Sequence, residues 1–450
     1  MPRTIAIVGA SFAGLGVARW LEPRAENADV EVVLIDKRPY HEFHALLYEV
    51  ATGAAAGRPE DCEKILASGV CINLHAYDRL LKGTHLTFRC DEVVGIDRRT
   101  RTLQLRGGDA VRYDALVLAI GAETAYYGIA GLKEHAIPLK SVRDALRIRR
   151  RMLELLDRAR RGTEQKISIL IGGGGATGVE FAAELANYLR TLVARGDIRS
   201  HDYEIAIVEA APRLLAAFPE RLSRMALQRL HRLGVRVLLD AAVKQVELGR
   251  AIVAPRSLKP GEEREQLLCG FAGDSCTLEA DLIVWTGGIQ FPSLPREAGF
   301  PCDPKGRVIV DVDLLVQGEQ CVFALGDCAS FTQHHLFWQK SGAGFTPSRA
   351  TQPLPPIASI AVREAPVAAA NALGCLDGYP LRRFRPPTLP SIVPLGGKYA
   401  GLAYRNWTWV GRGPWMLRSL VDLMYFCSAL GLVIGLRMWW RGARMYVQND

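Results

Sequence analysis

The sequence VGASFAGLGVA, residues 8–18, decides the fold of the first part of this chain. It follows an apolar stretch at residues 4–8 that predicts a short buried strand, and its second half continues into helical spacing at residues 15–21. A second apolar strand is predicted at residues 30–35. Strand, glycine turn, helix and strand together form one βαβ unit of the kind that binds dinucleotides.

The same pattern returns later in the chain. An apolar strand is predicted at residues 167–171, a glycine-rich turn follows, and a helix at residues 179–189 leads to a strand at residues 205–208. Single cores stop growing at roughly 250 to 300 residues, so a chain of 450 residues is expected to form two or three domains. The sequence therefore predicts an α/β protein with two Rossmann-like dinucleotide-binding domains.

Other segments complete this outline. Further strands are predicted at residues 103–105, 115–120, 235–239, 243–246, 251–253, 280–285 and 321–325, and a basic helix at residues 143–161. Two polar stretches, residues 255–275 and 330–356, are expected to be loops. Because the strand at residues 321–325 runs into a Gly-Asp turn, we expect the chain to return to the first domain near residue 291. The second domain would then be inserted in the first.

The first glycine turn has the chemistry of a phosphate site. Gly9, Ser11, Ala13 and Gly14 are small enough to let the backbone approach a pyrophosphate at a helix N-terminus, where unpaired N–H groups favour an anion. Asp36 follows Gly14 by 22 residues, close to the spacing of about 20 at which an acid accepts the ribose hydroxyls.

The second turn is a full GxGxxG, formed by Gly173, Gly175 and Gly178. Glu209 ends the next strand, where its carboxylate would accept from a ribose 2′-hydroxyl and repel a 2′-phosphate, which favours NADH over NADPH. Its distance from Gly178, 31 residues, is long and predicts an insertion in the connection. A solvated strand-end glutamate is the alternative. Asp327 in VFALGDCA could help to hold a flavin's ribityl and phosphate groups.

These elements and three further stretches resemble one flavoprotein family. YHEFHALLYEVATG (residues 40–53), GGGATGVEFAAEL (173–185) and PLPPIASIAVREA (353–365) are similar to type II NADH dehydrogenases. These are single-subunit NADH:quinone oxidoreductases within the superfamily of flavoproteins with two dinucleotide-binding domains. The resemblance covers nearly the whole chain. It implies an FAD-binding domain at residues 1–125 and 290–395, an NADH-binding domain at residues 126–289, and a membrane-docking segment at residues 396–450.

The resemblance also implies roles for single residues. It implies that Glu180 lies beside the nicotinamide and flavin rings, and that Arg363 and Glu364 lie near the electron acceptor. It implies FAD on Gly9, Ser11, Gly14, Asp36 and Asp327, and NADH on Gly173, Gly175, Gly178 and Glu209. Further cofactor contacts are expected at Phe12, Ala13, Lys37, Val93, Gly121, Gly288 and Ala358.

One motif departs from the family. Paired glutamines are common near the quinone head, whereas this chain has Arg363 and Glu364 there, and Ser359 where another glutamine is usual. The identity of the quinone therefore stays open. Arg363 and Glu364 could instead form an ion pair on a helix surface, where such pairs contribute little.

The spacing of the ten cysteines bears on two related classes of flavoenzyme. They show neither CxxC nor CxxxxC spacing, which speaks against a disulfide reductase, and none lies at residues 91–268 or 329–374, which disfavours sulfide:quinone chemistry. Cys328 is expected to be a small buried hydrophobe. Without an export signal in residues 1–9 or an evident pairing, we expect reduced cysteines in a reducing compartment.

The tail of the chain is basic and rich in tryptophan. Its arginines are Arg405, Arg412, Arg418, Arg437, Arg441 and Arg444, against Asp422 and Asp450. The apolar run at residues 423–436 is too short to span a bilayer, which needs about 20 residues. With Trp415, Trp439 and Trp440, it predicts a monotopic helix in the membrane interface. A buried core or dimerisation helix is the alternative.

The sequence thus predicts an FAD-dependent oxidoreductase that transfers a hydride from NADH to FAD and then two electrons to a membrane quinone. We expect it to be peripheral to the cytoplasmic face of the cell membrane, without metal or nucleic acid, and leave a homodimer open. Two alternatives remain: a sulfide or other small-donor:quinone oxidoreductase, and an NADH-sensing flavoprotein that acts through a partner. Whether it serves a respiratory chain or a biosynthetic quinone pool is also open.

Overall fold

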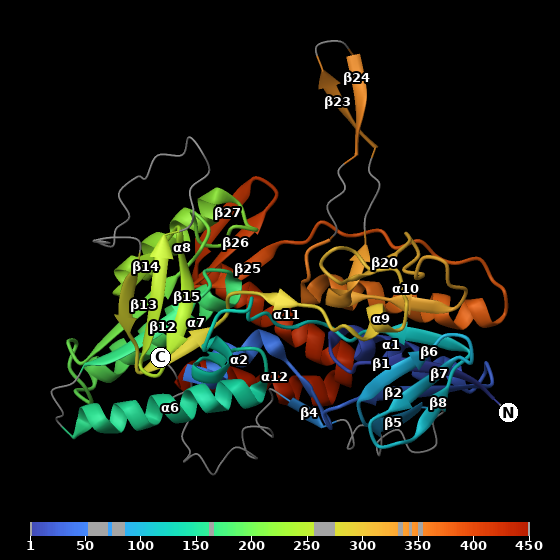
Figure 1. Ribbon diagram of the computed structural model, residues 1–450, viewed down its shortest axis with the longest axis horizontal. Coiled ribbons are helices and arrows are strands. Elements are labelled where there is room, and N and C mark those ends of the chain that lie inside the picture. Colours follow the sequence, from blue (N-terminus) through green and yellow to red (C-terminus); the bar gives the residue numbers. More distant parts are fainter. Residues whose placement is uncertain are drawn as a thin grey trace. The chain divides into compact units, whose positions relative to one another are not determined.

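The chain forms two compact units, each assembled from separate segments. The computed structural model describes residues 2–52, 71–73, 86–161, 166–255, 275–331, 336–341, 344–349 and 354–448. The first unit combines Met1–His41, Cys71–Glu123 and Ile289–Thr388, and the second unit combines Glu42–Val70, Thr124–Gly288 and Leu389–Asp450. Figure 1 shows the elements of both.

The first unit is built on a five-stranded sheet in which all neighbouring strands are parallel. In spatial order its strands are β21 (Val322–Ala324), β9 (Ala115–Leu118), β1 (Arg3–Val8), β2 (Val30–Asp36) and β5 (Leu86–Cys90). The central strands are almost continuous apolar runs, as expected where a parallel sheet is covered on both faces.

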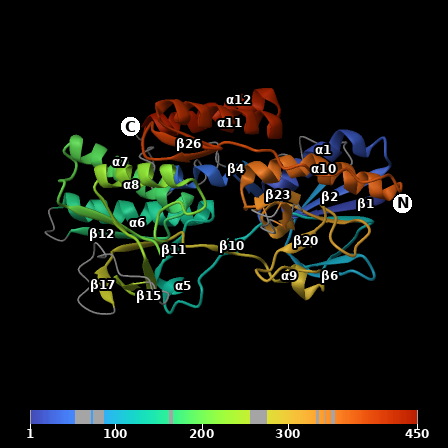
Figure 2. The ribbon, with the colours of Figure 1, turned by 90° about the horizontal axis from the view of Figure 1, so that it is seen from above.

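Two helices, α1 (Phe12–Ala25) and α10 (Ala358–Leu376), lie side by side along this sheet (Figure 2). They approach closely, because a Cβ added at Gly16 would lie only 2.8 Å from the Cβ of Ala365. The shorter elements of this unit are β4 (Cys71–Asn73), β6 (Val93–Asp97), β7 (Thr102–Leu105), β8 (Ala110–Arg112), α9 (Leu294–Glu297), β20 (Val308–Val310), the 3₁₀ helix η4 (Gly326–Cys328) and β22 (Ala329–Phe331).

The second unit repeats the parallel sheet. Its strands, in spatial order, are β11 (Ile137–Pro138), β18 (Leu282–Trp285), β12 (Ile167–Gly172), β13 (Tyr203–Val208) and β14 (Val235–Leu238). Its other elements are η1 (His44–Leu46), α2 (Leu47–Thr52), α5 (Leu132–His135), α6 (Val142–Arg160), α7 (Ala176–Ala194), α8 (Glu220–Arg232) and the antiparallel strands β15 (Ala241–Glu247), β16 (Arg250–Pro255) and β17 (Cys276–Glu279). Short strands lie where the chain passes between the units: β3 (Tyr40–Glu42), β10 (Glu123–Thr124) and β19 (Ile289–Gln290).

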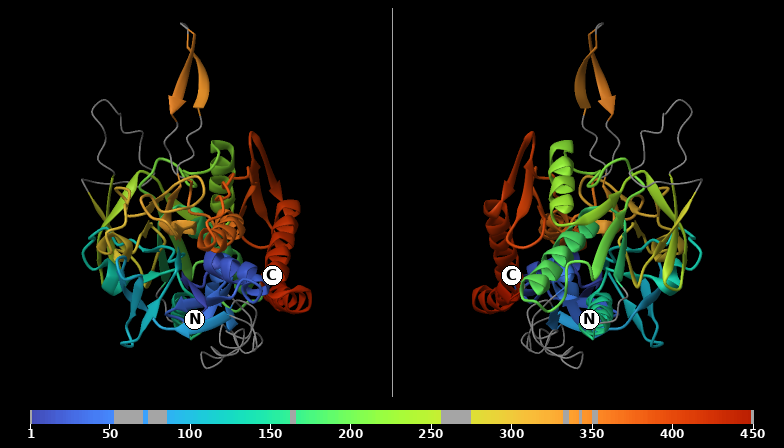
Figure 3. Two further views of the ribbon diagram at one scale, coloured as in Figure 1. Left: turned by 90° about the vertical axis from the view of Figure 1, so that its right-hand side faces the viewer. Right: turned by 90° about the vertical axis from the view of Figure 1, so that its left-hand side faces the viewer.

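The C-terminal residues belong to the second unit. They form an antiparallel sheet of β25 (Ser391–Pro394), β26 (Ala400–Tyr404) and β27 (Trp407–Gly411), followed by α11 (Arg412–Leu430) and α12 (Leu432–Gln448), drawn in red in Figure 3. The turn after β25 is bound to α7 and α8: Glu184 accepts from the N–H of Gly397 at 3.0 Å, and Arg229 donates to the carbonyl of Leu395 at 3.0 Å. The tail is therefore packed into the unit from its first turn.

The α/β fold with two Rossmann-like units is confirmed. The extra residues before Glu209 lengthen α7 to Ala194 and form the turn that precedes β13. Two loop predictions have different outcomes.

The loop predicted at residues 330–356 contains an antiparallel hairpin, β23 (Leu336–Ser341) and β24 (Gly344–Arg349). Gly344 and Pro347 disfavour strands, so the sequence carried no strand signal there. The loop predicted at residues 255–275 lies, except for its ends, outside the described residues.

The apolar run of the tail, residues 423–436, is divided between two helices. Gly431, at φ +80°, ends α11 before α12 begins, and the two helices pack against each other. A single interfacial helix is therefore wrong. The indole N–H of Trp439 donates to the carbonyl of Ser419 at 2.9 Å, so this tryptophan joins α12 to α11.

Candidate active site

The first glycine turn needs glycine at both of its ends. Gly9 has φ +100°, and a Cβ there would lie 2.3 Å from the carbonyl oxygen of Ala119; a Cβ at Gly14 would lie 1.8 Å from the carbonyl oxygen of Gly9. Helix α1 begins directly after Ser11, whose side chain makes no capping hydrogen bond. N–H groups at a helix N-terminus favour an anion.

Asp36 closes this turn from the end of β2. Its carboxylate accepts from the N–H groups of Ala10, at 2.8 Å, and of Arg38, at 2.9 Å. A carboxylate has about four acceptor positions, so it can accept further bonds from hydroxyl groups.

The buried side chain of His41 also contacts this turn. Burial lowers the pKa of this histidine to about 4, so its ring is neutral, and Nδ1 donates to the carbonyl of Ala10 at 3.1 Å. Phe12 packs edge-on against the same ring, at 5.3 Å between centroids. The YHEFH stretch thus contributes a support for the glycine turn, apart from any cofactor contact.

The second glycine turn repeats this geometry. A Cβ at Gly178 would lie 1.9 Å from the carbonyl oxygen of Gly173, whereas a Cβ at Gly175 would meet no described atom within 4 Å. Glu209 accepts from the N–H groups of Gly174, at 2.5 Å, and Ala211, at 2.7 Å, just as Asp36 does in the first unit. The carboxylate of Glu209 is therefore anchored at the turn, although the residue is half-exposed.

The remaining residues expected to contact cofactor are placed as follows. In the first unit, Ala13 is buried in the first turn of α1, Lys37 lies 3.6 Å from the carboxylate of Glu92, Val93 is buried at the start of β6, and Gly121 follows β9 with φ +67°. In the second unit, Gly288 has φ +153°, and a Cβ there would lie 2.0 Å from Tyr127 Oη.

Asp327 and Glu364 meet at one pocket of the first unit. The pocket lies between η4 and the start of α10, and Ala358 is the first residue of that helix. Its lining includes Gly326, Asp327, Ile357, Ile360, Ala361 and Glu364. Glu364 is 2% exposed and accepts from the N–H of Gly326 at 2.7 Å.

The environment of Glu364 favours its neutral form. Burial raises the pKa of Glu364 to about 7; the N–H of Gly326 lowers it, and the charge of Asp327 raises it further. Arg363 is exposed whereas Glu364 is buried, so the two residues do not form the surface ion pair considered from the sequence. Cys328 is buried beside this turn, and burial raises the pKa of its thiol to about 12, which confirms a small inert hydrophobe.

A second carboxylic acid with a raised pKa lies in the second unit. Glu180 lies in the second turn of α7 and is half-buried. Burial raises the pKa of Glu180 to about 7, the charge of Arg418 lowers it, and that of Asp422 raises it.

Arg418 and Asp422 are functional candidates that the sequence analysis missed. Both belong to α11 and are only 8% and 7% exposed. Arg418 donates to the hydroxyl of Tyr48 and, at 2.5 Å, to the carbonyl of Ala45. Counting Arg418 among the outward basic residues of the tail was therefore wrong. Its spacing of four residues from Asp422, the spacing of a helical ion pair, was the available signal.

Known proteins resemble this chain over most of its length. The type II NADH:quinone oxidoreductase of Staphylococcus saprophyticus is 26% identical over 401 residues, covering 88% of both chains, and that of Staphylococcus epidermidis is 26% identical over 436 residues, covering 96% of this chain and 97% of its own.

Solved structures share the fold. NDH2 from Plasmodium falciparum, determined with NADH, has a TM-score of 0.79 at 17% identity, covering 99% of this chain and 98% of its own. The sulfide:quinone oxidoreductase of Aquifex aeolicus has a TM-score of 0.71 at 18% identity, covering 95% and 92%. The family described as pyridine nucleotide-disulphide oxidoreductase matches residues 3–365, and the chain belongs to that family.

Proposed function

We propose that this protein is a flavin-dependent NADH:quinone oxidoreductase. The observation that carries the proposal is the combination of two complete dinucleotide turns, each closed by a strand-end carboxylate, with full-length relatives that are named type II NADH:quinone oxidoreductase. The absence of the cysteine positions expected for sulfide chemistry supports this function over the sulfide alternative.

The first unit fits FAD. Gly9, Ser11 and Gly14 offer a backbone cradle at an uncapped helix N-terminus, and Asp36 keeps acceptor positions for ribose hydroxyls. Asp327 lines the pocket at η4, beside the start of α10. The residues Phe12, Ala13, Lys37, Val93, Gly121 and Ala358 complete the proposed contacts. When bound, FAD supplies the redox chemistry, accepting a hydride from NADH and passing two electrons to a quinone.

The second unit fits NADH. Gly173 and Gly178 hold the turn, and the open space at Gly175 leaves room for a pyrophosphate. Gly288 is a further proposed contact. The nearby Arg213 donates to the carbonyls of Leu215, Phe218 and Ala216, so its guanidinium is already occupied by the loop backbone. Glu209 is thus the charged group that faces the ribose in this proposal, which favours NADH.

Replacing Glu209 by glutamine is expected to reduce the preference for NADH over NADPH about tenfold, because a charge-assisted hydrogen bond is roughly twice as strong as a neutral one. The ratio of the two kcat/KM values measures this. Glu204→Gln, at an exposed glutamate of β13, the strand that leads to Glu209, is the control and should leave the ratio unchanged. An equal ratio in Glu209→Gln and wild type would remove the ribose assignment.

Glu180 and Glu364 are the proposed proton-handling groups. Quinone reduction consumes two protons, and an acid with a pKa near 7 can both hold and release a proton at neutral pH. Arg363, exposed beside Glu364, is proposed to assist at the acceptor by its charge. Arg418 acts on Glu180 by holding its pKa down.

Arg418→Met is expected to destabilise the protein by about 3 kcal/mol, because it leaves buried carboxyl groups without their cation. The folded-state pKa of Glu180, already above its ordinary value, should rise further. Stability from Glu180 is present below pH 4.5 and is lost as the pH rises through the folded pKa, so that loss should move to higher pH. Melting temperature against pH measures both effects. Arg418→Lys should restore most of the loss, and Arg412→Met, at an exposed position of α11, should have little effect.

The C-terminal helices carry the proposed membrane contact. Among the helices that the structure describes, none combines the length and apolar character needed to span a bilayer. Among the side chains of α11 and α12 that the structure describes, ten large hydrophobic ones are exposed. We call this set the apolar face: Met416, Leu417, Leu420, Val421, Met424, Leu432, Val433, Ile434, Leu436 and Trp440. Exposed Arg412 and Arg437 flank it. Such a face with basic neighbours suits an anionic membrane surface, in particular the cytoplasmic leaflet.

The double variant Leu420→Ser/Met424→Ser is expected to bind anionic vesicles at least about thirtyfold more weakly, because each substitution removes roughly 1 kcal/mol or more of apolar burial. Co-sedimentation measures the effect. Leu248→Ser is the matched control, since Leu248 is 88% exposed but lies far along the chain at the β15–β16 turn. A truncation before Trp415 is unsuitable, because it would also remove buried Arg418 and Phe426. Equal sedimentation of double variant and control would contradict the proposed contact.

Anaerobic stopped-flow mixing tests the function as a whole. Purified protein should lose its visible flavin absorbance on mixing with NADH and regain it when a quinone is added. An absorbance that NADH leaves unchanged, or that no quinone restores, would contradict the proposed function.

A further inference from the structure

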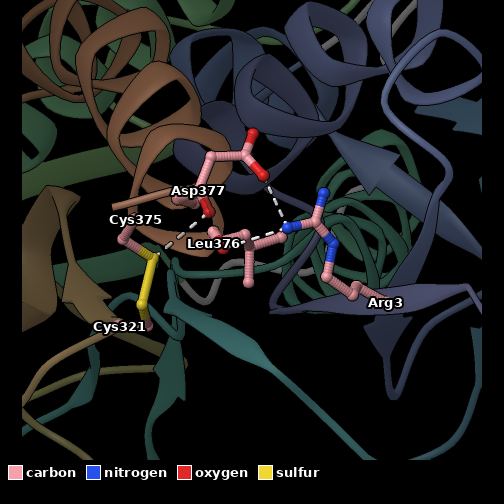
Figure 4. The surroundings of a disulfide bond; sticks show 6 residues. Arg3, Cys321, Cys375, Leu376 and Asp377 are labelled. Atoms are coloured by element: carbon pink, nitrogen blue, oxygen red, sulfur yellow. Dashed lines mark hydrogen bonds and ion pairs between the residues drawn. A yellow bond between two sulfur atoms is a disulfide. The ribbon is translucent and has the colours of Figure 1, made fainter. Parts of the chain in front are cut away.

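A disulfide joins the edge of the first unit's sheet to the end of its longest helix. Cys321, directly before β21, is bonded to Cys375, in the last turn of α10, with their Cα atoms 5.9 Å apart (Figure 4). The expectation of unpaired cysteines is wrong for this pair, because 54 residues of sequence separation gave no sign of their contact. Both residues are half-buried, so small thiols can reach them.

The disulfide has a counterpart at the other end of the same two elements. Gly326, just past β21, donates its N–H to Glu364 on α10. Cys321 and Gly326 are five residues apart on extended chain, about 16 Å. Glu364 and Cys375 are 11 residues apart on a helix, also about 16 Å. The strand and the helix therefore run antiparallel with matched lengths, and each end carries one link.

Arg3 also holds the end of α10, independently of the disulfide. Arg3, at the start of β1, donates to the carbonyl of Leu376 at 3.0 Å and to the carboxylate of Asp377 at 2.6 Å (Figure 4). The end of α10 therefore stays attached to β1 when its link to β21 is cut. Loss of the disulfide removes the covalent link between α10 and the start of β21, while the helix stays packed on α1 and β9 and the hydrogen bond from Gly326 to Glu364 remains at the other end.

We propose that Cys321–Cys375 is a reversible redox modification site that positions Glu364 at its pocket. Reduction proceeds by thiol–disulfide exchange with a dithiol: the protein S–S bond breaks, two protein thiols form, and the dithiol supplies two electrons and two protons as it closes to a disulfide. A small-molecule disulfide reverses the step. In the reduced form the hydrogen bond from the N–H of Gly326 to Glu364 breaks more often, so the carboxyl group of Glu364 is less firmly positioned at the pocket.

Peptide mapping and hydrogen exchange test the proposal without any activity. Non-reducing digestion of air-oxidised protein should yield a linked peptide with Cys321 and Cys375, which dithiothreitol separates. Reduction should speed amide exchange about tenfold around Gly326 and in the second half of α10, and leave α1 unchanged. Absence of the linked peptide, or equal exchange in both redox forms, would overturn the proposal.

Variants connect the site to turnover, and this part rests on the proposed function. Cys321→Ser and Cys375→Ser should each raise the quinone KM about threefold, like reduced wild type, while flavin bleaching by NADH stays unchanged. Neither variant should respond further to dithiothreitol. Cys90→Ser, at an exposed free cysteine of the same unit, is the control and should respond as wild type does. Serine variants that still respond to reduction would overturn the proposal. Oxidised wild type that reduces no quinone would contradict the proposed function, and the exchange result would still decide the redox site.

Discussion

Gly178→Ala is expected to abolish most NADH oxidation while the flavin stays bound. The added Cβ would lie 1.9 Å from the carbonyl oxygen of Gly173 and 2.7 Å from Thr286 Oγ1, so α7 must shift away from the turn. A displacement of about 1 Å at a positioning group can cost a factor of about 100, and we expect kcat/KM for NADH to fall by at least that much. Steady-state kinetics with the visible flavin spectrum measure both parts of the prediction.

The two glycine turns supply matched controls. Gly14→Ala places a Cβ 1.8 Å from the carbonyl oxygen of Gly9, and it should yield a colourless protein that has lost FAD. Gly175→Ala meets no described atom within 4 Å at an ordinary φ of −70°, so it should fold normally and weaken NADH alone. Gly178→Ala with wild-type kinetics, or with the same flavin loss as Gly14→Ala, would contradict the assignment of the two nucleotides to the two units.

Glu364→Gln is expected to slow the quinone step about 100-fold, the lower end of what a positioned acid contributes, and to leave flavin bleaching by NADH at its normal rate. Glutamine has nearly the same shape and still accepts from Gly326, so the pocket should keep its form. The titrating proton is what the variant loses. Single-turnover reoxidation with quinone measures the effect.

The pH dependence provides an independent check on Glu364. Its folded-state pKa of about 7 lies above the ordinary value of 4.5, so its contribution to stability is full below pH 4.5 and is lost as the pH rises through 7. In Glu364→Gln this component of the melting-temperature profile should vanish. Glu319→Gln, at another acid of the first unit, should keep it. Wild-type quinone rates in Glu364→Gln would remove this acid from the mechanism.

Much of the fold was predictable because both units follow simple local rules. The apolar strands that become β1, β2, β12 and β13 are buried on both faces, and the turns after β1 and β12 need glycine for steric reasons, so composition and spacing identify them. Asp36 and Glu209 were predictable for the same reason: each lies at the end of the second strand of a βαβ unit, and the order of strand, turn, helix and strand fixes that position in the sequence.

The missed features depend on contacts between distant segments. Arg418 lies 238 residues from Glu180 along the chain, and Cys321 finds Cys375 only because α10 returns along β21. His41 was quoted within a motif, yet its role as a neutral support for Ala10 follows from burial, which a single sequence cannot reveal. Gly431 lies within an apolar run, and the sequence alone did not indicate that its left-handed backbone separates two helices.

Helix α11 exposes several of its large apolar side chains and buries two of its charged ones. Met416, Leu420 and Met424 face outward, while Arg418 and Asp422 face the protein interior. In a substitution scan along it, each of two phenotypes, lipid affinity and proton chemistry, should therefore recur every three to four residues. Assigning the core from hydrophobicity alone would misplace these five residues, although Phe426 in the same helix is buried as an apolar residue should be.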